Sequence, residues 1–446
     1  MVSITHALRR IKDDLAKFLE PVFIEQVCRE AGHTWRDRLL DPVTVVHLFI
    51  LQILHHNTAC AALPRIAGRA FSASAYCQAR ARLPLKVITT LAVKIGSALQ
   101  EDLPPSGTWH GHRVVLVDGS GFSMPDTPAL RKHFGQPGGQ KKGCGFPVAH
   151  LLATFDAGSG LILDLIAAPL RTHDMAQVNQ IHPKLRPGDL LVADRGFCSF
   201  AHLALILRYE MHACLRLHQK QIVDFRPHRP PAGRRDAKGR PRSRWLKRLG
   251  PFDQIVEWMK PEQKPAWMSE KDFTALPSSI QVRELRYRVA TPGFRAREIT
   301  LVTTLLDAQK YPATELVELY RSRWQVETNL GHLKTTLGMD VLHCQTVDGV
   351  LKEMWMFALV YNLVRMVMFE AARRQRVQPD GISFIDALRW LAFAPPDQPL
   401  PTLIVHPRRP ERTEPRVIKR RMKEFPLMKK PRAELRKTLL KQRYVA

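Results

Sequence analysis

Hydrophobic residues in the first part of the chain follow the spacing of amphipathic helices. Apolar side chains recur every three or four positions in 11–23, 45–54 and 87–99. This period places them on one face of a helix, and basic residues lie between them. We therefore predict a helical N-terminal domain over 1–105. Both a DNA-binding module and a plain helical bundle with a solvated face stay open for it.

After residue 105 the pattern changes to short apolar runs that predict buried strands. The first, in 112–122, is β-branched and is expected to end at Asp118, where glycine follows. Similar runs lie in 149–156, 161–170 and 188–197, and the last of them ends at Asp194. The turn sequence AGSG joins the second and third runs, which predicts a hairpin. Helical patterns follow the third and fourth runs, at 173–185 and 201–209. Strands that alternate with helices indicate an α/β core, whose first part we place at 106–214.

Residues 215–295 differ in character from this core. Their first part, 215–250, holds twelve Lys and Arg against two Asp and is rich in Pro and Gly, so we expect a mobile loop. Strand-like stretches come next, and we interpret the whole segment as a β-rich insertion. A buried strand at 297–307 and helices from 313 onward are expected to complete the core, whose second part we place at 296–376.

The charge of the chain indicates a class of partner. Lys and Arg number 68 against 41 Asp and Glu, a formal net charge of +27. Such a surplus favours a polyanion, and nucleic acid first, because phosphate contacts by Lys and Arg release counterions. A membrane surface is the rival, but the apolar run at 45–54 is too short to span a bilayer. We expect double-stranded DNA as the partner, no membrane, and a cytoplasmic location at the nucleoid.

The C-terminal region, 377–446, ends in a strongly basic segment. Residues 401–446 hold fifteen Lys and Arg against four Glu. Basic tails often serve as solubilising arms, but the end of this one has a helical period. We favour contacts with DNA or with a second copy of the chain.

Two aspartates each follow an apolar run and begin a glycine-containing sequence. Asp118 lies in VVLVDGSGF and Asp194 in LLVADRGF. Carboxylates at strand ends in α/β domains lie at the sheet edge where sites form, and these two would meet if their strands are neighbours. Aspartate is also a routine cap or turn residue, so the pair alone does not establish catalysis.

A charged stripe on a predicted helix adds a third carboxylate. Its residues occur at offsets of 0, 3, 7 and 14, namely Tyr320, Arg323, Glu327 and Lys334. Offsets of three, four and seven return to one helical face. A solvated, salt-bridged face produces the same spacing, although it leaves the tyrosine and the nearby Trp324 unexplained.

Three carboxylates in a basic setting indicate a hard cation. The seven cysteines are scattered and form no CxxC pair, so oxygen ligands are the available set. Mg²⁺ prefers such ligands and keeps water and phosphate oxygens in its shell. Two such ions about 4 Å apart activate the attacking oxygen and stabilise the leaving oxygen of a phosphodiester. Arg323 and Lys334 would neutralise the neighbouring phosphates.

The stripe matches the Y-x2-R-x3-E-x6-K signature of the insertion-sequence-four family of bacterial transposases. Asp118 and Asp194 resemble that family's first and second catalytic aspartates, and the order of segments is similar over about 10–375. The resemblance implies a ribonuclease-H-like fold, a mixed sheet flanked by helices. It also implies a DDE transposase in which Asp118, Asp194 and Glu327 bind two Mg²⁺ ions, with Mn²⁺ as a substitute.

The resemblance further implies a reaction and its DNA contacts. Water attack would free a 3′-hydroxyl at the element end, which attacks the opposite strand to form a hairpin; the reopened end then joins target DNA. Tyr320, Arg323 and Lys334 would contact phosphates, and a homodimer would act in trans in a synaptic complex. A tryptophan of the insertion would stack on a flipped base, and we prefer Trp258 over Trp245 and Trp267.

Three polar residues leave alternatives open. Arg195, directly after the second aspartate, either touches DNA or pairs with a carboxylate. Arg216 either ends a strand near the site or is a surface charge. Asp174 stands at a predicted helix start and fits a cap better than a ligand.

Two other classes of protein share parts of this pattern. A DNA-binding protein descended from a transposase would have lost catalysis, yet all three carboxylates and the signature are present here. Another ribonuclease-H-like nuclease, such as a junction resolvase, would cut without joining. The β-rich insertion and the charged stripe disfavour that second class.

Overall fold

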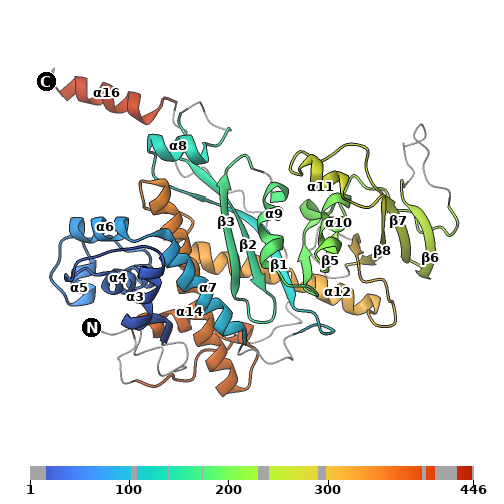
Figure 1. Ribbon diagram of the computed structural model, residues 1–446, viewed down its shortest axis with the longest axis horizontal. Helices are drawn as coiled ribbons and strands as arrows, with labels where there is room; N and C mark the ends of the chain where they lie inside the picture. Colours follow the sequence, from blue (N-terminus) through green and yellow to red (C-terminus); the bar gives the residue numbers. More distant parts are fainter. Residues whose placement is uncertain are drawn as a thin grey trace.

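A nine-stranded mixed sheet runs through the middle of the molecule, with helices on both faces (Figure 1). The computed structural model describes residues 17–101, 108–138, 141, 143–172, 174–229, 241–289, 298–393, 398–406 and 429–443. Part of the predicted mobile loop, 230–240, and much of the basic C-terminal segment, 407–428, lie outside the described residues. The mixed α/β architecture predicted from the sequence is confirmed.

The elements have the following bounds. The strands are β1 (Val114–Ser123), β2 (Val148–Asp156), β3 (Ile162–Pro169), β4 (Leu190–Ala193), β5 (His212–Arg216), β6 (Arg244–Gly250), β7 (Asp253–Met259), β8 (Ser279–Arg288) and β9 (Glu298–Thr303). The α-helices are α3 (Pro21–Glu30), α4 (Pro42–Leu54), α5 (Leu63–Ala67), α6 (Ala73–Arg82), α7 (Leu85–Glu101), α8 (Pro128–Phe134), α9 (Val178–Ile181), α10 (Phe200–Arg208), α11 (Glu270–Thr274), α12 (Ala313–Ser322), α13 (Trp324–Gly331), α14 (Val347–Gln375), α15 (Phe384–Phe393) and α16 (Arg432–Arg443). Short 3-10 turns are η1 (Lys17–Leu19), η3 (Asp174–Gln177), η4 (His182–Lys184), η5 (Arg195–Phe197) and η7 (Pro379–Gly381), and η6 (His332–Thr336) is a π-helical turn.

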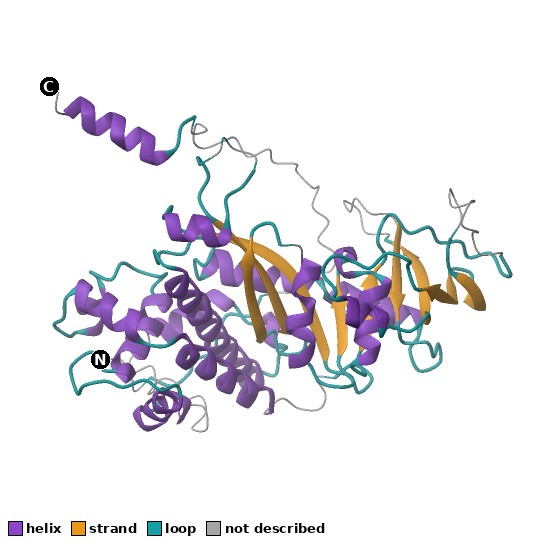
Figure 2. Cartoon of the chain, turned by 45° about the horizontal axis from the view of Figure 1, so that its top comes forward, coloured by secondary structure: helices purple, strands orange, loops and turns teal. Residues whose placement is uncertain are grey.

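The strands lie in the order β3-β2-β1-β4-β5-β9-β8-β7-β6. β1, β4 and β5 are parallel neighbours, and the other neighbouring pairs are antiparallel. The hairpin predicted around AGSG is β2 paired with β3. β6, β7 and β8, from the predicted insertion, continue this sheet beyond β9 (Figure 2).

Alternate residues of the central strands enter two separate cores. Leu116 of β1 and Val192 of β4 pack in the core that contains α7 and α14. Val117 and Ala193, one position further along, pack in the core that contains α10. This alternation follows from the two-residue period of a strand. It determines which side chains face the helix α13.

The first strand does not end at Asp118, as the sequence analysis expected. β1 continues to Ser123 because β2 pairs with it up to Ser123 opposite Val148. Only the pairing with β4 stops early, at Val117 opposite Ala193. Asp118 therefore lies inside β1, at the level where β4 ends.

The helix expected over 173–185 is also not continuous. From Asp174 onward the segment forms η3, α9 and η4 in succession, each of three or four residues. Pro183 lies at the start of η4, where its missing N–H and its ring disfavour continuation of the preceding helix.

α14 is a buried core helix. Among the described residues it is the one helix long and apolar enough to cross a membrane by length and composition. However, 89% of its apolar window is buried inside the protein, where it packs against α7, α4 and α15. Its hydrophobicity is therefore explained by the protein interior.

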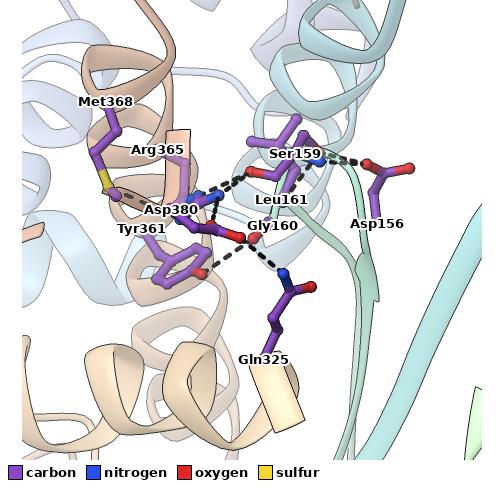
Figure 3. A network of polar contacts seen from close by, with 9 residues as sticks. All are labelled: Asp156, Ser159, Gly160, Leu161, Gln325, Tyr361, Arg365, Met368 and Asp380. Atoms are coloured by element: carbon purple, nitrogen blue, oxygen red, sulfur yellow. Dashed lines mark hydrogen bonds and ion pairs between the residues drawn. The ribbon is translucent and has the colours of Figure 1, made fainter. Parts of the chain in front are cut away.

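A buried arginine of α14 holds the turn between β2 and β3 (Figure 3). Arg365 Nε donates to the Ser159 carbonyl at 2.9 Å, and Nη2 forms a 2.9 Å ion pair with Asp380 Oδ1. Tyr361 Oη donates to the carbonyl of Gly160 at 3.0 Å. These partners are required because an unpaired buried charge costs several kcal/mol. The hairpin that flanks β1 is thus tied to the central helix.

Replacement of Gly160 tests this connection. Gly160 has φ +68°, and an added Cβ would collide with the guanidinium of Arg365. We expect Gly160→Ala to lower the free energy of unfolding by about 2–4 kcal/mol, from left-handed strain plus displacement of Arg365. Gly68→Ala is the matched control, since Gly68 has φ +60° with open space around the Cβ position, and it should cost only about 1 kcal/mol. Equal losses in urea unfolding would contradict the packing role of Arg365.

Candidate active site

Asp118 and Asp194 lie side by side where β4 ends. The parallel register pairs Val117 with Ala193, so the next residue on each strand is an aspartate. Asp194 directly follows β4 and directly precedes η5. Strand alternation directs both side chains to the face of β1 that contacts α13. The neighbouring strands that the two-aspartate prediction required are therefore present.

Glu327 on α13 is linked to Asp118 by a single guanidinium. Arg323 Nη2 donates to Glu327 Oε1 at 2.8 Å, and Arg323 Nη1 lies 3.4 Å from Asp118 Oδ2. The Arg323 side chain is mostly buried, whereas the Glu327 carboxylate is exposed to solvent. Arg323 thus bridges two of the three predicted carboxylates.

The second aspartate is surrounded by a phenol and another guanidinium. Tyr320 Oη donates to Asp194 Oδ1 at 3.3 Å. Arg216 Nη1 lies 3.9 Å from the same oxygen. Arg216 is the last residue of β5, the parallel neighbour of β4. Two residues of the signature therefore contact the aspartates: Arg323 contacts Asp118, and Tyr320 contacts Asp194.

Lys334 reaches the strand that carries the first aspartate. Its Nζ donates to Ser120 Oγ at 3.0 Å, and Ser120 lies two positions after Asp118, on the same face of β1. Lys334 belongs to the π-helical turn η6 that extends α13, and such turns occur frequently at functional sites. The predicted stripe is one surface, although the helix is interrupted at Arg323 and widens at His332.

The ionised form of the Asp118 carboxyl is disfavoured, chiefly because the group is buried. Burial raises its pKa above the usual value, and the nearby charges of Glu327 and Asp194 raise it further. The Gly119 N–H and the Arg323 guanidinium oppose this rise without cancelling it. A cation at this place would favour the ionised form.

Tyr320 on α12 and Arg323 at the junction of α12 with α13 both stay protonated. Burial disfavours the charge on Arg323, but the hydrogen bond to Glu327 and the neighbouring negative charges outweigh it and raise the pKa of Arg323. Burial also raises the pKa of the Tyr320 hydroxyl, and Asp194 adds to the rise. Arg323 is therefore a fixed positive charge, and Tyr320 is a hydrogen-bond donor.

The donor set suits a hard divalent cation. Three carboxylates approach from β1, from the end of β4 and from α13, and oxygen ligands of this kind are those that Mg²⁺ prefers. Within the described part of the chain, no three His, Cys, Asp or Glu side chains are grouped closely enough to hold a metal ion as they stand. The bridge made by Arg323 separates Asp118 from Glu327. For Asp118 and Glu327 to share an ion, Arg323 has to leave this position.

Arg195 lies in η5, directly after Asp194. Its side chain is exposed, and Nη1 donates to Gln219 Oε1 at 2.7 Å. The hydrogen-bond partner is thus an amide oxygen. Arg195 stands at the rim of the site.

Trp258 does not reach the surface, contrary to the position expected of a base-stacking residue. Only 6% of it is exposed, because it points into the core beneath β7, and its Nε1 donates to Glu284 Oε1 at 2.9 Å. The alternatives Trp245 and Trp267 are half-buried. Trp324, the neighbour of Arg323, is 55% exposed.

Two site residues needed the structure to be recognised. Arg216 was ambiguous between a strand end and a surface charge, and the β4–β5 pairing places it beside Asp194. Ser120 stood unremarked in the DGSG sequence, where it contacts Lys334. Strand alternation was the signal for Ser120, since it lies two positions after an aspartate.

Three comparisons relate this geometry to known proteins. A family model described as a transposase DDE domain matches residues 109–363, more than half of the chain. Transposase InsG for insertion sequence element IS4, from Escherichia coli strain K12, is 24% identical over 96% of this chain and 96% of that protein. The transposase for insertion sequence element IS231B, from Bacillus thuringiensis subsp. berliner, is 21% identical over 73% of each chain.

Among solved structures, the cryo-EM structure of the piggyBac transposase synaptic complex with hairpin DNA aligns with 88% of this chain and 80% of that chain. The TM-score is 0.44 and the sequence identity 10%. The matched DDE domain contains Asp118, Asp194 and Glu327 and the strands that bring the two aspartates together. As the sequence predicted, the chain belongs to the DDE transposase family, enzymes that hydrolyse and transfer phosphodiester bonds.

Proposed function

We propose that the protein is the transposase of a bacterial insertion sequence. It cuts DNA at the ends of its element and joins the freed 3′-hydroxyl to target DNA. The observation that carries this proposal is the convergence of Asp118, Asp194 and Glu327, linked through Arg323 and Tyr320. Similarity to InsG over 96% of both chains supports the same role.

DDE transposases use divalent metal ions, and we propose two Mg²⁺ ions here, for which Mn²⁺ substitutes. Asp118, Asp194 and Glu327 would hold them. When bound, such ions activate the attacking oxygen and stabilise the leaving one. The protein's contribution is to hold three carboxylates from separate segments in one place, with Tyr320 and Arg216 orienting Asp194.

The basic side chains around the carboxylates are proposed to bind DNA phosphates. Lys334 and Arg323 stand on the same surface as Glu327, and Arg195 lies at the rim. Phosphates next to the scissile bond would compete with Asp118 and Glu327 for the guanidinium of Arg323. DNA binding would therefore free these carboxylates for the metal ions.

The larger assembly is proposed from the resemblance and the charge. Residues 1–105 would bind DNA, and residues 377–446 would contact DNA or a second copy. The catalytic core would be formed by 106–214 and 296–376, with 215–295 inserted. A hairpin intermediate and a homodimeric synaptic complex follow from the resemblance to the insertion-sequence-four family. The +27 charge favours DNA as the partner and a cytoplasmic location at the nucleoid.

Glu327→Gln tests the assignment of the third carboxylate. The amide keeps an oxygen that accepts from Arg323 but removes the metal-binding charge. We expect Mg²⁺-dependent nicking and joining of DNA that carries the ends of its own element to fall about a thousandfold, because a lost metal ligand removes several kcal/mol of transition-state stabilisation. DNA binding should be retained, and EDTA should abolish cleavage by the unmodified protein.

Glu318→Gln is the matched control for this experiment. Glu318 lies on α12, is exposed and pairs with Arg321 outside the carboxylate cluster, so activity should be unchanged. Tight binding of the element ends without cleavage under Mg²⁺ or Mn²⁺ would indicate a DNA-binding relic. Cleavage without joining would indicate a nuclease.

Lys334→Ala tests the proposed phosphate contact. We expect weaker binding of the element ends and a slope of log affinity against log salt that is smaller by about one unit, since one phosphate contact is lost. Lys310→Ala is the control: Lys310 is exposed beside Tyr311, whose hydroxyl meets His112 at the opposite end of β1. An unchanged salt slope for Lys334→Ala would contradict the contact.

A further inference from the structure

A carboxylate lies directly behind the strand that carries Asp118. Asp174 begins η3, in the crossover between β3 and β4, and its side chain packs on Gly119. A Cβ at Gly119 would lie 3.0 Å from Asp174 Cγ and closer still to Oδ1. A side chain at position 119 would therefore force the Asp174 carboxylate to move from this place.

His150 holds the Asp174 carboxylate in place. His150 Nε2 contacts Asp174 Oδ1 in a short hydrogen bond. His150 lies on β2 opposite Gly121 of β1. The His150–Asp174 pair thus connects β2 to the crossover across the back of the DGSG sequence.

The pair lies on the face of β1 opposite to Glu327. Val115 and Val117 belong to the core with α10, so Gly119 faces the same way and Asp118 faces α13. η3 also packs against η5, the turn that follows Asp194. The segment that begins with Asp174 therefore contacts both the strand of Asp118 and the turn after Asp194.

The DGSG sequence needs such external support. Gly119 and Gly121 have no side chains with which to pack, and glycine leaves the backbone more conformational freedom than other residues do. A carboxylate that fills the space over Gly119 limits where the neighbouring Asp118 can stand. Residues that orient metal ligands in this way typically change metal affinity or activity by about 10–100-fold when they are mutated.

We propose that Asp174, held by His150, is a positioning residue for the transposase reaction. It fixes the placement of Asp118 relative to Asp194 and so supports binding of the divalent cation. This inference rests on the proposed function of the two aspartates as metal ligands. Asp174 is not itself a ligand, because it approaches β1 from the opposite face.

Mn²⁺ binding to the full-length protein in complex with DNA that carries the ends of its element tests this role without a cleavage assay. Electron paramagnetic resonance follows the free ion, and the DNA alone gives the background. We expect Asp174→Ala to bind Mn²⁺ about tenfold more weakly than the unmodified protein. Asp174→Asn should restore most of the affinity, because the amide oxygen still accepts from His150. His150→Phe keeps a ring but removes the hydrogen bond, and should also weaken binding.

Two further variants make the result specific. Asp118→Asn should abolish the binding and so assign it to this site. Asp164→Ala is the matched control and should leave Mn²⁺ binding unchanged. It also removes a paired carboxylate, because Asp164 forms a 2.6 Å ion pair with Lys184, but this pair joins β3 to η4 and not to β1. Circular dichroism and the thermal midpoint check that each variant is folded.

The possible results distinguish the proposed metal site from the positioning role of Asp174. No Mn²⁺ binding by the complex of the unmodified protein with DNA, above the background of the DNA alone, would overturn the proposed metal site itself. Binding that Asp118→Asn abolishes but that Asp174→Ala and His150→Phe leave unchanged would overturn the positioning role alone. Weakened binding in both variants, with recovery in Asp174→Asn, would support it, as would nicking by Asp174→Ala that recovers at high Mn²⁺.

Discussion

Parallel pairing between β1 and β4 is the contact on which the site depends, because it places Asp118 next to Asp194. The register is determined by hydrophobic burial on both faces: a shift by one residue would exchange the side chains of the two cores. The hairpin of β2 and β3 supports β1 from one side, and Arg365 of α14 holds the turn of that hairpin. Distant packing therefore determines where the two carboxylates stand.

The electrostatic cost of grouping three carboxylates is offset from α12 and α13. Arg323 contacts Asp118 and Glu327, while Tyr320 donates to Asp194. Burial and the neighbouring carboxylates still leave the pKa of Asp118 raised. Additional positive charge beside Asp118, such as a divalent cation, would therefore stabilise its ionised form. Behind the same strand, Asp174 occupies the space over Gly119. The site is thus supported from both faces of β1.

Local patterns in the sequence predicted much of the fold. The hairpin, the strand before Asp194 and the helical stripe at 320–334 each depend on residues close in sequence, so periodicity and turn chemistry were sufficient. The length of β1 was mispredicted because its pairing with β2 extends beyond the pairing with β4. The burial of Trp258 could not be read from the sequence, because the face of β7 that is buried depends on which elements cover the sheet.

By itself the sequence identified the candidate site residues, since the types and spacing of Asp118, Asp194 and the 320–334 stripe are local and chemically specific. Its surplus of Lys and Arg also indicated a negatively charged partner. Only the tertiary structure decided that Arg216 stands beside Asp194 and that Asp174 packs against Gly119. These contacts join segments far apart in the chain, and strand order and register, which no local pattern encodes, bring them together.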